Sequence, residues 1–269
     1  MSGSYDFGTF ENNSSELNRL ILQAKHAIQF EKSIWNSLPI SPGMNVLDLG
    51  CGPGVITKSM SEYLPSLNIT GLDVNPQLLE IARSQKKTYD ENHLSFVEGS
   101  VYGLPFEDNQ FDFIYSRFLF QHLNLPLNAL NEIFRVLKPK GNLCILDVDD
   151  RWLCLEPECT AFEELKMLAI NHQKKRGGNR LIGQQLPELL SQSHFENVNA
   201  SIKVITSYDL GLKPFLDITT GFKKETLMDI DHGEALVNQI ESYCSSHPEA
   251  WGAVGLFIVT AGKQLNEMQ

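Results

Sequence analysis

The sequence has 269 residues, of which 42% are hydrophobic, and its 33 acidic and 22 basic residues give a formal net charge of −11 at pH 7. A chain of this length can bury one large core, so we expect a principal domain with elaborations rather than independent modules. The negative charge opposes the electrostatic attraction that supplies most non-specific affinity for nucleic acid. A nucleic-acid substrate is therefore disfavoured, unless a local basic patch overrides the net charge.

The cysteines and the hydropathy pattern indicate a cellular compartment. The five cysteines are odd in number and form no CxxC pair, which is typical of reduced thiols in a cytosolic protein. The first residues contain no basic stretch followed by an apolar one, and no uninterrupted apolar run approaches the roughly 20 residues of a membrane span. We expect a cytoplasmic protein without a membrane segment.

The first predicted element is a long amphipathic helix. Asn13 followed by Glu16 is typical of a capped helix start, and apolar residues then recur at helical spacing until Pro39. Strand-like and helix-like segments alternate after it. The pattern predicts helices that begin at Gly54, Pro76 and Pro126, and strands at 44–49, 68–74, 94–98, 111–116 and 142–148. This alternation is typical of a parallel sheet covered by helices on both faces.

After Asp150 the pattern changes from alternation to mostly helical spacing. It predicts helices at 158–175 and 182–192, strands at 198–207 and 254–261, and a helical segment at 213–246. These inserted helices could roof a pocket.

A strand, a glycine turn and a helix start follow one another directly at 46–54, where the sequence reads VLDLGCGPG. Glycines there admit unusual backbone angles and let a ligand approach the main chain closely. The next strand ends at Asp73, whose carboxylate could accept hydrogen bonds from both hydroxyls of a ribose. A short glycine pattern alone can also mark an ordinary turn.

The spacing of the glycines argues against two other nucleotide sites. A nicotinamide or flavin dehydrogenase would have G-x-G-x-x-G, but the third glycine position is Val55 here, and the glycine falls at Gly54. The Lys-Ser/Thr pair that follows the loop of nucleoside triphosphatases is absent as well.

The loop at 46–54 resembles the first motif of the class I S-adenosylmethionine-dependent methyltransferases, and Asp73 resembles the acidic end of their second motif. The similarity extends from about Met44 to Asp147, through Gly99-Ser100, Leu104-Pro105-Phe106, Phe111-Asp112 and the LKPKG segment at 137–141. Together these motifs look like the type 11 small-molecule branch, which includes quinone and sterol C-methyltransferases.

The resemblance implies S-adenosyl-L-methionine as cofactor and an α/β fold. The expected fold is a Rossmann-like, seven-stranded, mostly parallel sheet whose last strand is antiparallel, with N-terminal helices and inserted lid helices. Three regions follow from it: an N-terminal helical cap at 1–43, the cofactor-binding core at 44–150, and lid helices with the C-terminal strands that complete the same sheet at 151–269.

The resemblance also implies roles for individual residues. The loop glycines would line the methionine moiety with Asp48 ordering the loop, and Asp73 would hold the ribose diol. Val74 and Val101 would flank the adenine, Ser100 stands where similar enzymes offer an acidic residue to it, and Ser116 and Arg117 would face the methionine end. Tyr5, Arg19 and Gln23 could close the site, or be ordinary helix residues. The expected cofactor-binding residues are Gln23, Asp48, Gly50, Cys51, Gly52, Gly54, Asp73, Val74, Ser100, Val101, Ser116 and Arg117.

Two residues are candidates for catalysis. His122 follows the fourth strand, close to the expected methyl group, and could act as a general base or be a structural histidine. Asp149 lies with Asp147 and Asp150 after the fifth strand, where an acid could be a base, a substrate anchor or a Mg²⁺ ligand. Because the fourth strand ends in Ser116 and not in an acid, the metal site is incomplete, and we expect no metal.

The acceptor stays open at this point. Residues 176–190 are a candidate substrate wall or a surface helical turn. The motifs of nucleobase-amine and cytosine C5 methyltransferases are absent, which favours a small-molecule substrate over nucleic acid. The alternatives are a regulatory module that binds the cofactor without turnover, and a protein or tRNA methyltransferase. The oligomeric state is open, with a homodimer as one option.

Overall fold

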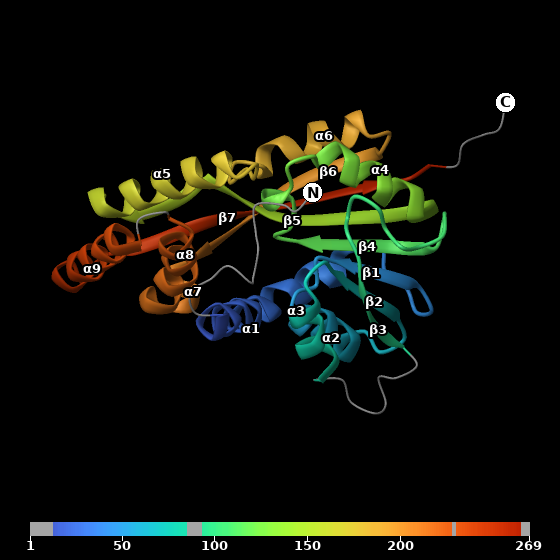
Figure 1. Ribbon diagram of the computed structural model, residues 1–269, viewed down its shortest axis with the longest axis horizontal. Helices are drawn as coiled ribbons and strands as arrows, with labels where there is room; N and C mark the ends of the chain where they lie inside the picture. Colours follow the sequence, from blue (N-terminus) through green and yellow to red (C-terminus); the bar gives the residue numbers. More distant parts are fainter. Residues whose placement is uncertain (1–12, 85–92, 228–229, 265–269) are drawn as a thin grey trace.

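The computed structural model describes residues 13–84, 93–227 and 230–264. In this part of the chain seven strands form one sheet in the order β3-β2-β1-β4-β5-β7-β6 (Figure 1). The strands are β1 Asn45–Leu49, β2 Asn68–Asp73, β3 Leu94–Glu98, β4 Phe111–Arg117, β5 Leu137–Glu156, β6 Glu196–Thr206 and β7 Trp251–Gly262. The first five pair in parallel, and β7 is antiparallel to both β5 and β6. The predicted Rossmann-like sheet with an antiparallel last strand is confirmed.

The helices cover both faces of the sheet (Figure 1). Buried leucines and isoleucines of α4 and α6 pack on one face, and those of α1 and α2 pack on the other. Helices α5, α8 and α9 form a third apolar cluster at the far end of β5. The helices are α1 Asn13–Ser37, α2 Val55–Tyr63, α3 Pro76–Ser84, α4 Pro126–Val136, α5 Thr160–Lys175, α6 Leu186–Gln192, α7 Ser207–Leu210, α8 Leu212–Thr226 and α9 Ile230–Ser246.

Strand β5 is much longer than the predicted segment 142–148. It continues to Glu156, so the predicted end of the strand at 148 is wrong, whereas α5, at Thr160–Lys175, agrees with the predicted helix at 158–175. The extension is stable because β7, about a hundred residues later in the chain, pairs with it from Leu153 to Glu156. Local periodicity cannot show a partner that is so distant in sequence.

A bulge interrupts this pairing and shapes the later part of the strand. Val148 pairs with Leu256 and Leu153 pairs with Val254, so four residues of β5 lie opposite Gly255 alone. A bulge re-aims the side chains next to it, and here Asp149 and Asp150 are both buried.

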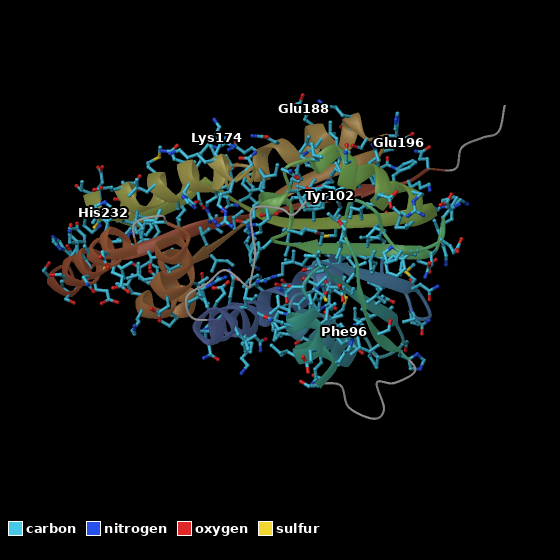
Figure 2. The ribbon with its side chains drawn as sticks, viewed as in Figure 1. Phe96, Tyr102, Lys174, Glu188, Glu196 and His232 are labelled. Atoms are coloured by element: carbon cyan, nitrogen blue, oxygen red, sulfur yellow. The ribbon has the colours of Figure 1, made fainter. Side chains whose placement is uncertain are left out.

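Charged side chains face outward over the helical layers. Lys174 on α5 and Glu188 on α6 project from the outer surface (Figure 2). None of the helices in the described ranges is long and apolar enough to cross a membrane.

Candidate functional site

The glycine loop joins β1 to α2 and is tied to the end of β2. Gly50, Gly52 and Gly54 have φ angles of 79°, 52° and 74°, a left-handed backbone that favours glycine. The amides of Gly50 and Cys51 donate to the Leu72 carbonyl at 2.8 and 3.0 Å. The loop therefore sits against the strand that ends in the acidic residue.

Two of these glycines are needed for different reasons. A Cβ on Gly54 would lie 2.7 Å from the Cβ of Ala82 and 3.0 Å from the ring of Phe96, which is labelled on β3 in Figure 2. A Cβ on Gly52 would meet no atom of the described residues within 4 Å. Gly54 permits close packing of helix on sheet, whereas Gly52 leaves open space above the loop.

Asp73, the last residue of β2, is hydrogen-bonded to the loop that follows β1. The Gly52 amide donates to its Oδ2 at 2.8 Å and the Asn75 amide donates to its Oδ1 at 2.9 Å. Burial raises the pKa of this carboxyl, and the backbone donors partly offset the rise. Each oxygen accepts one backbone hydrogen bond and keeps lone-pair capacity for a further donor.

Asp48 lies beneath the loop and not beside the cavity. It is 3% exposed and accepts a 2.6 Å hydrogen bond from Oγ1 of Thr57 on α2. Burial raises the pKa of Asp48 to about 7, and the neighbouring Glu31 charge adds to the rise. Asp48 therefore links β1 to α2 below the glycine loop.

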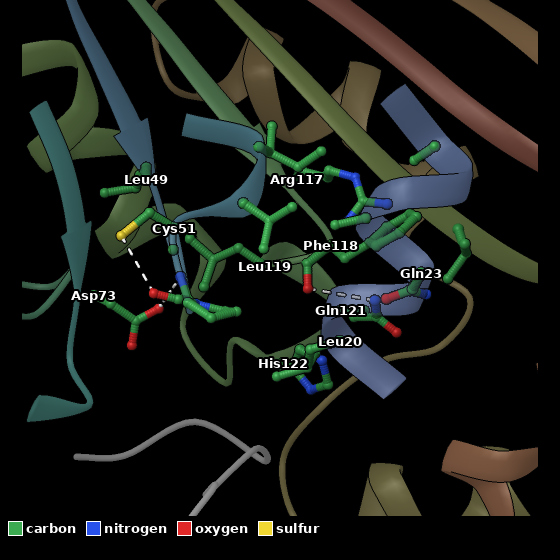
Figure 3. Close-up of a pocket in the computed structure, with 18 of the residues that line it drawn as sticks. Leu20, Gln23, Leu49, Cys51, Asp73, Arg117, Phe118, Leu119, Gln121 and His122 are labelled. Carbon is green, nitrogen blue, oxygen red and sulfur yellow. Dashed lines mark hydrogen bonds between the residues drawn. The ribbon is translucent and has the colours of Figure 1, made fainter. Parts of the chain in front are cut away.

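A cavity of about 550 Å³ opens over the loop (Figure 3). This volume lies within the range of roughly 300–1,000 Å³ that is usual for small-ligand sites. Its walls come from α1, the loop, the turns after β2 and β3, the end of β4, and segments of the C-terminal half.

Most of the predicted site residues meet at this cavity. Those that line it are Gln23, Gly50, Cys51, Gly52, Asp73, Val74, Ser100, Val101, Arg117 and His122, together with Arg19. Asp48 and Gly54 support the loop from below and do not line the cavity. Tyr5 lies outside the described residues.

Ser116 and Asp149 lie apart from the cavity. Ser116 is fully buried within the sheet between Leu49 and Ile145, and among the described residues its Oγ finds no hydrogen-bond partner. The Asp149 carboxylate forms an ion pair with Arg151 at 2.5 Å and accepts a hydrogen bond from the Gln184 amide at 3.2 Å. Asp149 is therefore engaged elsewhere, whereas its neighbour Asp150 does line the cavity.

A buried polar cluster lies in the cavity wall just after the end of β4 and beside the bulge of β5. Arg180 binds the Asp150 carboxylate through Nε at 2.5 Å and Nη2 at 2.9 Å, and its Nη1 donates to Oε1 of Gln121 at 3.2 Å. Next to it, burial and the charges of Arg180, Arg19 and Arg176 lower the pKa of His122 to about 3. The cluster therefore presents a neutral imidazole and a charge-balanced ion pair to the cavity.

The side of the cavity formed by β5, β7, β6 and the helices α7 and α8 is lined mostly by apolar residues. We call this part the apolar chamber; it consists of Leu153, Ile205, Leu210, Phe215, Ile218, Val254 and Leu256. These residues come from β5, β6, β7, α7 and α8. Such a lining favours a ligand with a large non-polar surface.

Two buried polar residues of this site, Gln121 and Glu31, belong to none of the sequence motifs. Gln121 precedes the candidate histidine. Glu31 is fully buried on α1 and accepts hydrogen bonds from Tyr115 and Arg117. Glu31 lies on the same apolar helix face as Ala24, Ala27 and Ile34. An acid in that position indicates that a buried partner balances its charge.

Metal ligands do not gather in the part of the chain that the structure describes: no group of three or more His, Cys, Asp or Glu side chains there could hold an ion.

Comparison with known proteins agrees with this geometry. Residues 47–145 match the family model of a methyltransferase domain. An uncharacterized methyltransferase of Schizosaccharomyces pombe is 38% identical over 119 residues, 42% of this chain and 43% of the relative. The demethylmenaquinone methyltransferase of Listeria welshimeri is 30% identical over 141 residues, 51% of this chain and 60% of the relative. The chain thus spans about half the length of the curated relatives it matches.

Solved structures show the same fold over more of the chain. The crystal structure of the [4+2]-cyclase SpnF has a TM-score of 0.60 and 21% identity, and the match covers 89% of this chain and 82% of the cyclase. At this identity the likeness concerns the fold alone. Residues 47–145 therefore match a methyltransferase domain, and the strand order and the glycine loop held against Asp73 agree with the arrangement expected of class I S-adenosylmethionine-dependent methyltransferases.

Proposed function

We propose that the protein transfers the methyl group of S-adenosylmethionine to a small, largely apolar acceptor. The observation that carries this proposal is one continuous cavity, with Gly52 and Asp73 on one side and the apolar chamber on another. A cofactor site and an acceptor site that share one space allow direct transfer between the two ligands.

The residues present fit the cofactor in three places. Asp73 has acceptor capacity for the two ribose hydroxyls, and Gly52 leaves room for the ligand against the main chain. Val101 and the exposed Val74 offer apolar contacts for the adenine beside Ser100. Arg117 stands at the opposite side, beside the loop, for the methionine end.

The bound cofactor would supply a methyl group already activated on a sulfonium sulfur. The work of the chain is then to align the acceptor atom with that group and to exclude water, and alignment alone can lower a barrier by several kcal/mol. The acceptor atom forms the new bond to carbon, the carbon–sulfur bond breaks and its electron pair stays on sulfur, and the acceptor gives up a proton where it carries one.

We propose His122 as the residue that receives this proton. Its low pKa keeps the imidazole neutral at pH 7, a form that can accept a hydrogen bond from the acceptor. Asp149 is less suited, because it is paired with Arg151 away from the cavity. An imidazole of such low basicity would favour acceptors whose proton is already acidic.

A small molecule suits this chain better than a nucleic acid or a protein. The formal net charge of −11 opposes binding to phosphate backbones, and the apolar chamber lies among buried elements. The name of the Listeria relative, a demethylmenaquinone methyltransferase, supports an acceptor with an apolar body. We also propose that the protein acts in the cytoplasm.

The test combines binding and turnover. Isothermal titration calorimetry should detect binding of S-adenosylhomocysteine, and a cell extract incubated with protein and methyl-labelled cofactor should yield labelled product that partitions into organic solvent. The Asp73→Ala variant is the control for enzyme dependence. Undetectable binding would refute the proposal as a whole. Binding without labelled product would favour the alternative of a regulatory module, and label in protein or tRNA would favour a macromolecular acceptor.

A further inference from the structure

Arg117 is held in a defined position at the methionine side of the cavity. It is the last residue of β4, and because Leu49 pairs with Ser116, Arg117 lies beside Gly50. Its side chain is 12% exposed and lines the cavity, where it points toward α1 in Figure 3.

The residue that holds it is Glu31, 86 positions earlier in the chain. Glu31 Oε1 accepts a hydrogen bond from Arg117 Nε at 2.5 Å, and Oε2 accepts one from the Tyr115 hydroxyl at 2.9 Å. Glu31 is fully buried, so this charge-assisted contact is shielded from water and joins α1 to the end of β4.

Because Glu31 is bound through Nε, the edge of the guanidinium that the two terminal nitrogens form is available to a ligand. An arginine carries five N–H donors, and the two terminal nitrogens form an edge with two parallel donors that matches a carboxylate. Within the part of the chain that the structure describes, neither Nη of Arg117 donates to a protein acceptor; its other contact is with the ring of Phe118, at 4.1 Å from the guanidinium carbon to the ring centroid.

We propose that this edge of Arg117 binds the α-carboxylate of the cofactor's methionine moiety, and that Glu31 is the positioning residue that aims it. The inference rests on the proposed cofactor site and adds a recognition element that residues outside the glycine loop provide. The end of β4 lies next to β1, so a ligand whose ribose is at Asp73 and whose chain crosses the loop extends toward Arg117.

The charges of the site agree with this arrangement. Glu31 balances the guanidinium before the cofactor binds, which removes the cost of a lone buried cation. Asp48 lies nearby and feels the charges of both residues, and its raised pKa reduces its share of negative charge near neutral pH. A carboxylate can therefore approach Arg117 without facing a fully ionised acid below the loop.

The experiment compares two ligands that differ by one group. S-adenosylhomocysteine carries the α-amine and the α-carboxylate, whereas S-adenosyl-3-thiopropylamine keeps the amine and lacks the carboxylate. Calorimetry gives the ratio of their dissociation constants for the wild type and the variants Arg117→Gln, Arg117→Lys and Glu31→Gln. Circular dichroism and thermal unfolding report on the fold of each variant.

We expect the wild type to prefer S-adenosylhomocysteine by at least tenfold. Arg117→Gln should bring the ratio close to one by weakening only that ligand. Arg117→Lys keeps the charge but lacks the two-pronged edge, and Glu31→Gln leaves the guanidinium without its charged anchor, so both should reduce the ratio by threefold or more. Tyr115→Phe removes the other hydrogen bond to Glu31 and should leave the ratio within twofold.

Two results would overturn the proposal. One is an equal loss of affinity for both ligands in Arg117→Gln, which would make the arginine a structural residue. The other is a change in Tyr115→Phe as large as that in Glu31→Gln, which would mean that Glu31 only joins the helix to the sheet. A wild type that binds neither ligand would instead refute the proposed function, and with it this inference. If Glu31→Gln does not fold, the two Arg117 variants still decide whether Arg117 binds the carboxylate of the cofactor.

Discussion

At the scale of single residues, Gly52 and Gly54 have different roles: Gly52 faces the proposed ligand, and Gly54 permits the close packing of α2 on the sheet. Alanine at either position strains a left-handed backbone by about 1 kcal/mol. Gly54→Ala should cost several times more in unfolding free energy because its Cβ would collide with Ala82, whereas Gly52→Ala should mainly weaken binding of S-adenosylhomocysteine. Urea unfolding and calorimetry on both variants measure the two effects. The reverse pattern would mean that the cofactor does not lie over Gly52.

Asp73 is predicted to carry much of the cofactor affinity. Asp73→Ala should weaken binding by more than tenfold, because two buried ribose hydroxyls lose their acceptor. Asp73→Asn keeps the size and one carbonyl oxygen, so its loss should be smaller. Calorimetric titration with S-adenosylhomocysteine is the measurement, and unchanged affinity in Asp73→Ala would show that the ribose assignment is wrong.

Asp48 should make stability depend on pH. Its pKa is raised from 3.8 to about 7 on folding, so between these values the folded state binds more protons than the unfolded state. Stability therefore falls as the pH rises through this window. Asp48→Asn cannot ionise, and its stability relative to the wild type should increase by on the order of 2 kcal/mol between pH 5 and pH 8.

This effect can be isolated because Asp147, whose pKa is also raised to about 7, is present in both proteins. Its contribution cancels when the free energies of unfolding of variant and wild type are compared at each pH. A difference between the two proteins that does not change from pH 5 to pH 8 would indicate that Asp48 is already ionised in the folded state.

At the scale of elements, local sequence signals predicted most of the central sheet. The strand from 94 to 98 and the helix starts at Pro76 and Pro126 are where the pattern puts them, because Pro is favoured in the first turn of a helix. Strand β5 was predicted too short, because its extension depends on pairing with β7 and not on its own periodicity.

In the site as well, local sequence signals predicted some residues, whereas others depend on partners that are distant in the sequence. The residues of the glycine loop and Asp73 were predictable because their chemistry requires fixed residue types at fixed spacing. Glu31 and Gln121 were not, because each acts through a partner that only the folded chain brings near: Arg117 for the first and Arg180 for the second. The sequence does not show the bulge in β5, at which Asp149 pairs with Arg151 while Asp150 lines the cavity.

Helix α8 offers a test of the apolar chamber. Ile218 is partly exposed and lines the cavity, so Ile218→Trp should fill acceptor space without disturbing the core. We expect methyl transfer to an extract-derived acceptor to fall at least tenfold, while the dissociation constant of S-adenosylhomocysteine stays within twofold. Met167→Trp on the exposed side of α5 is the matched control. Unaltered transfer in Ile218→Trp would remove the acceptor from this chamber.

At the scale of the whole molecule, ligand binding should be visible as thermal stabilisation. A ligand at a hundred times its dissociation constant stabilises the folded state by about 2.7 kcal/mol. For a chain of this size each kcal/mol raises Tm by roughly 2–4 °C, so saturating S-adenosylhomocysteine should raise Tm by about 5–10 °C. Differential scanning calorimetry tests this, and Asp73→Ala should show little shift at the same ligand concentration. An equal shift in both would indicate binding elsewhere.

The long strand β5 has a consequence for how such a protein can diversify. The family match ends at residue 145, whereas the strand continues to Glu156 and there contributes Leu153 to the apolar chamber. The end of the matched domain and a residue that lines the apolar chamber therefore lie within a single strand. Evolution could exchange the outer half of that strand and its roof for a new acceptor while inheriting the inner half unchanged.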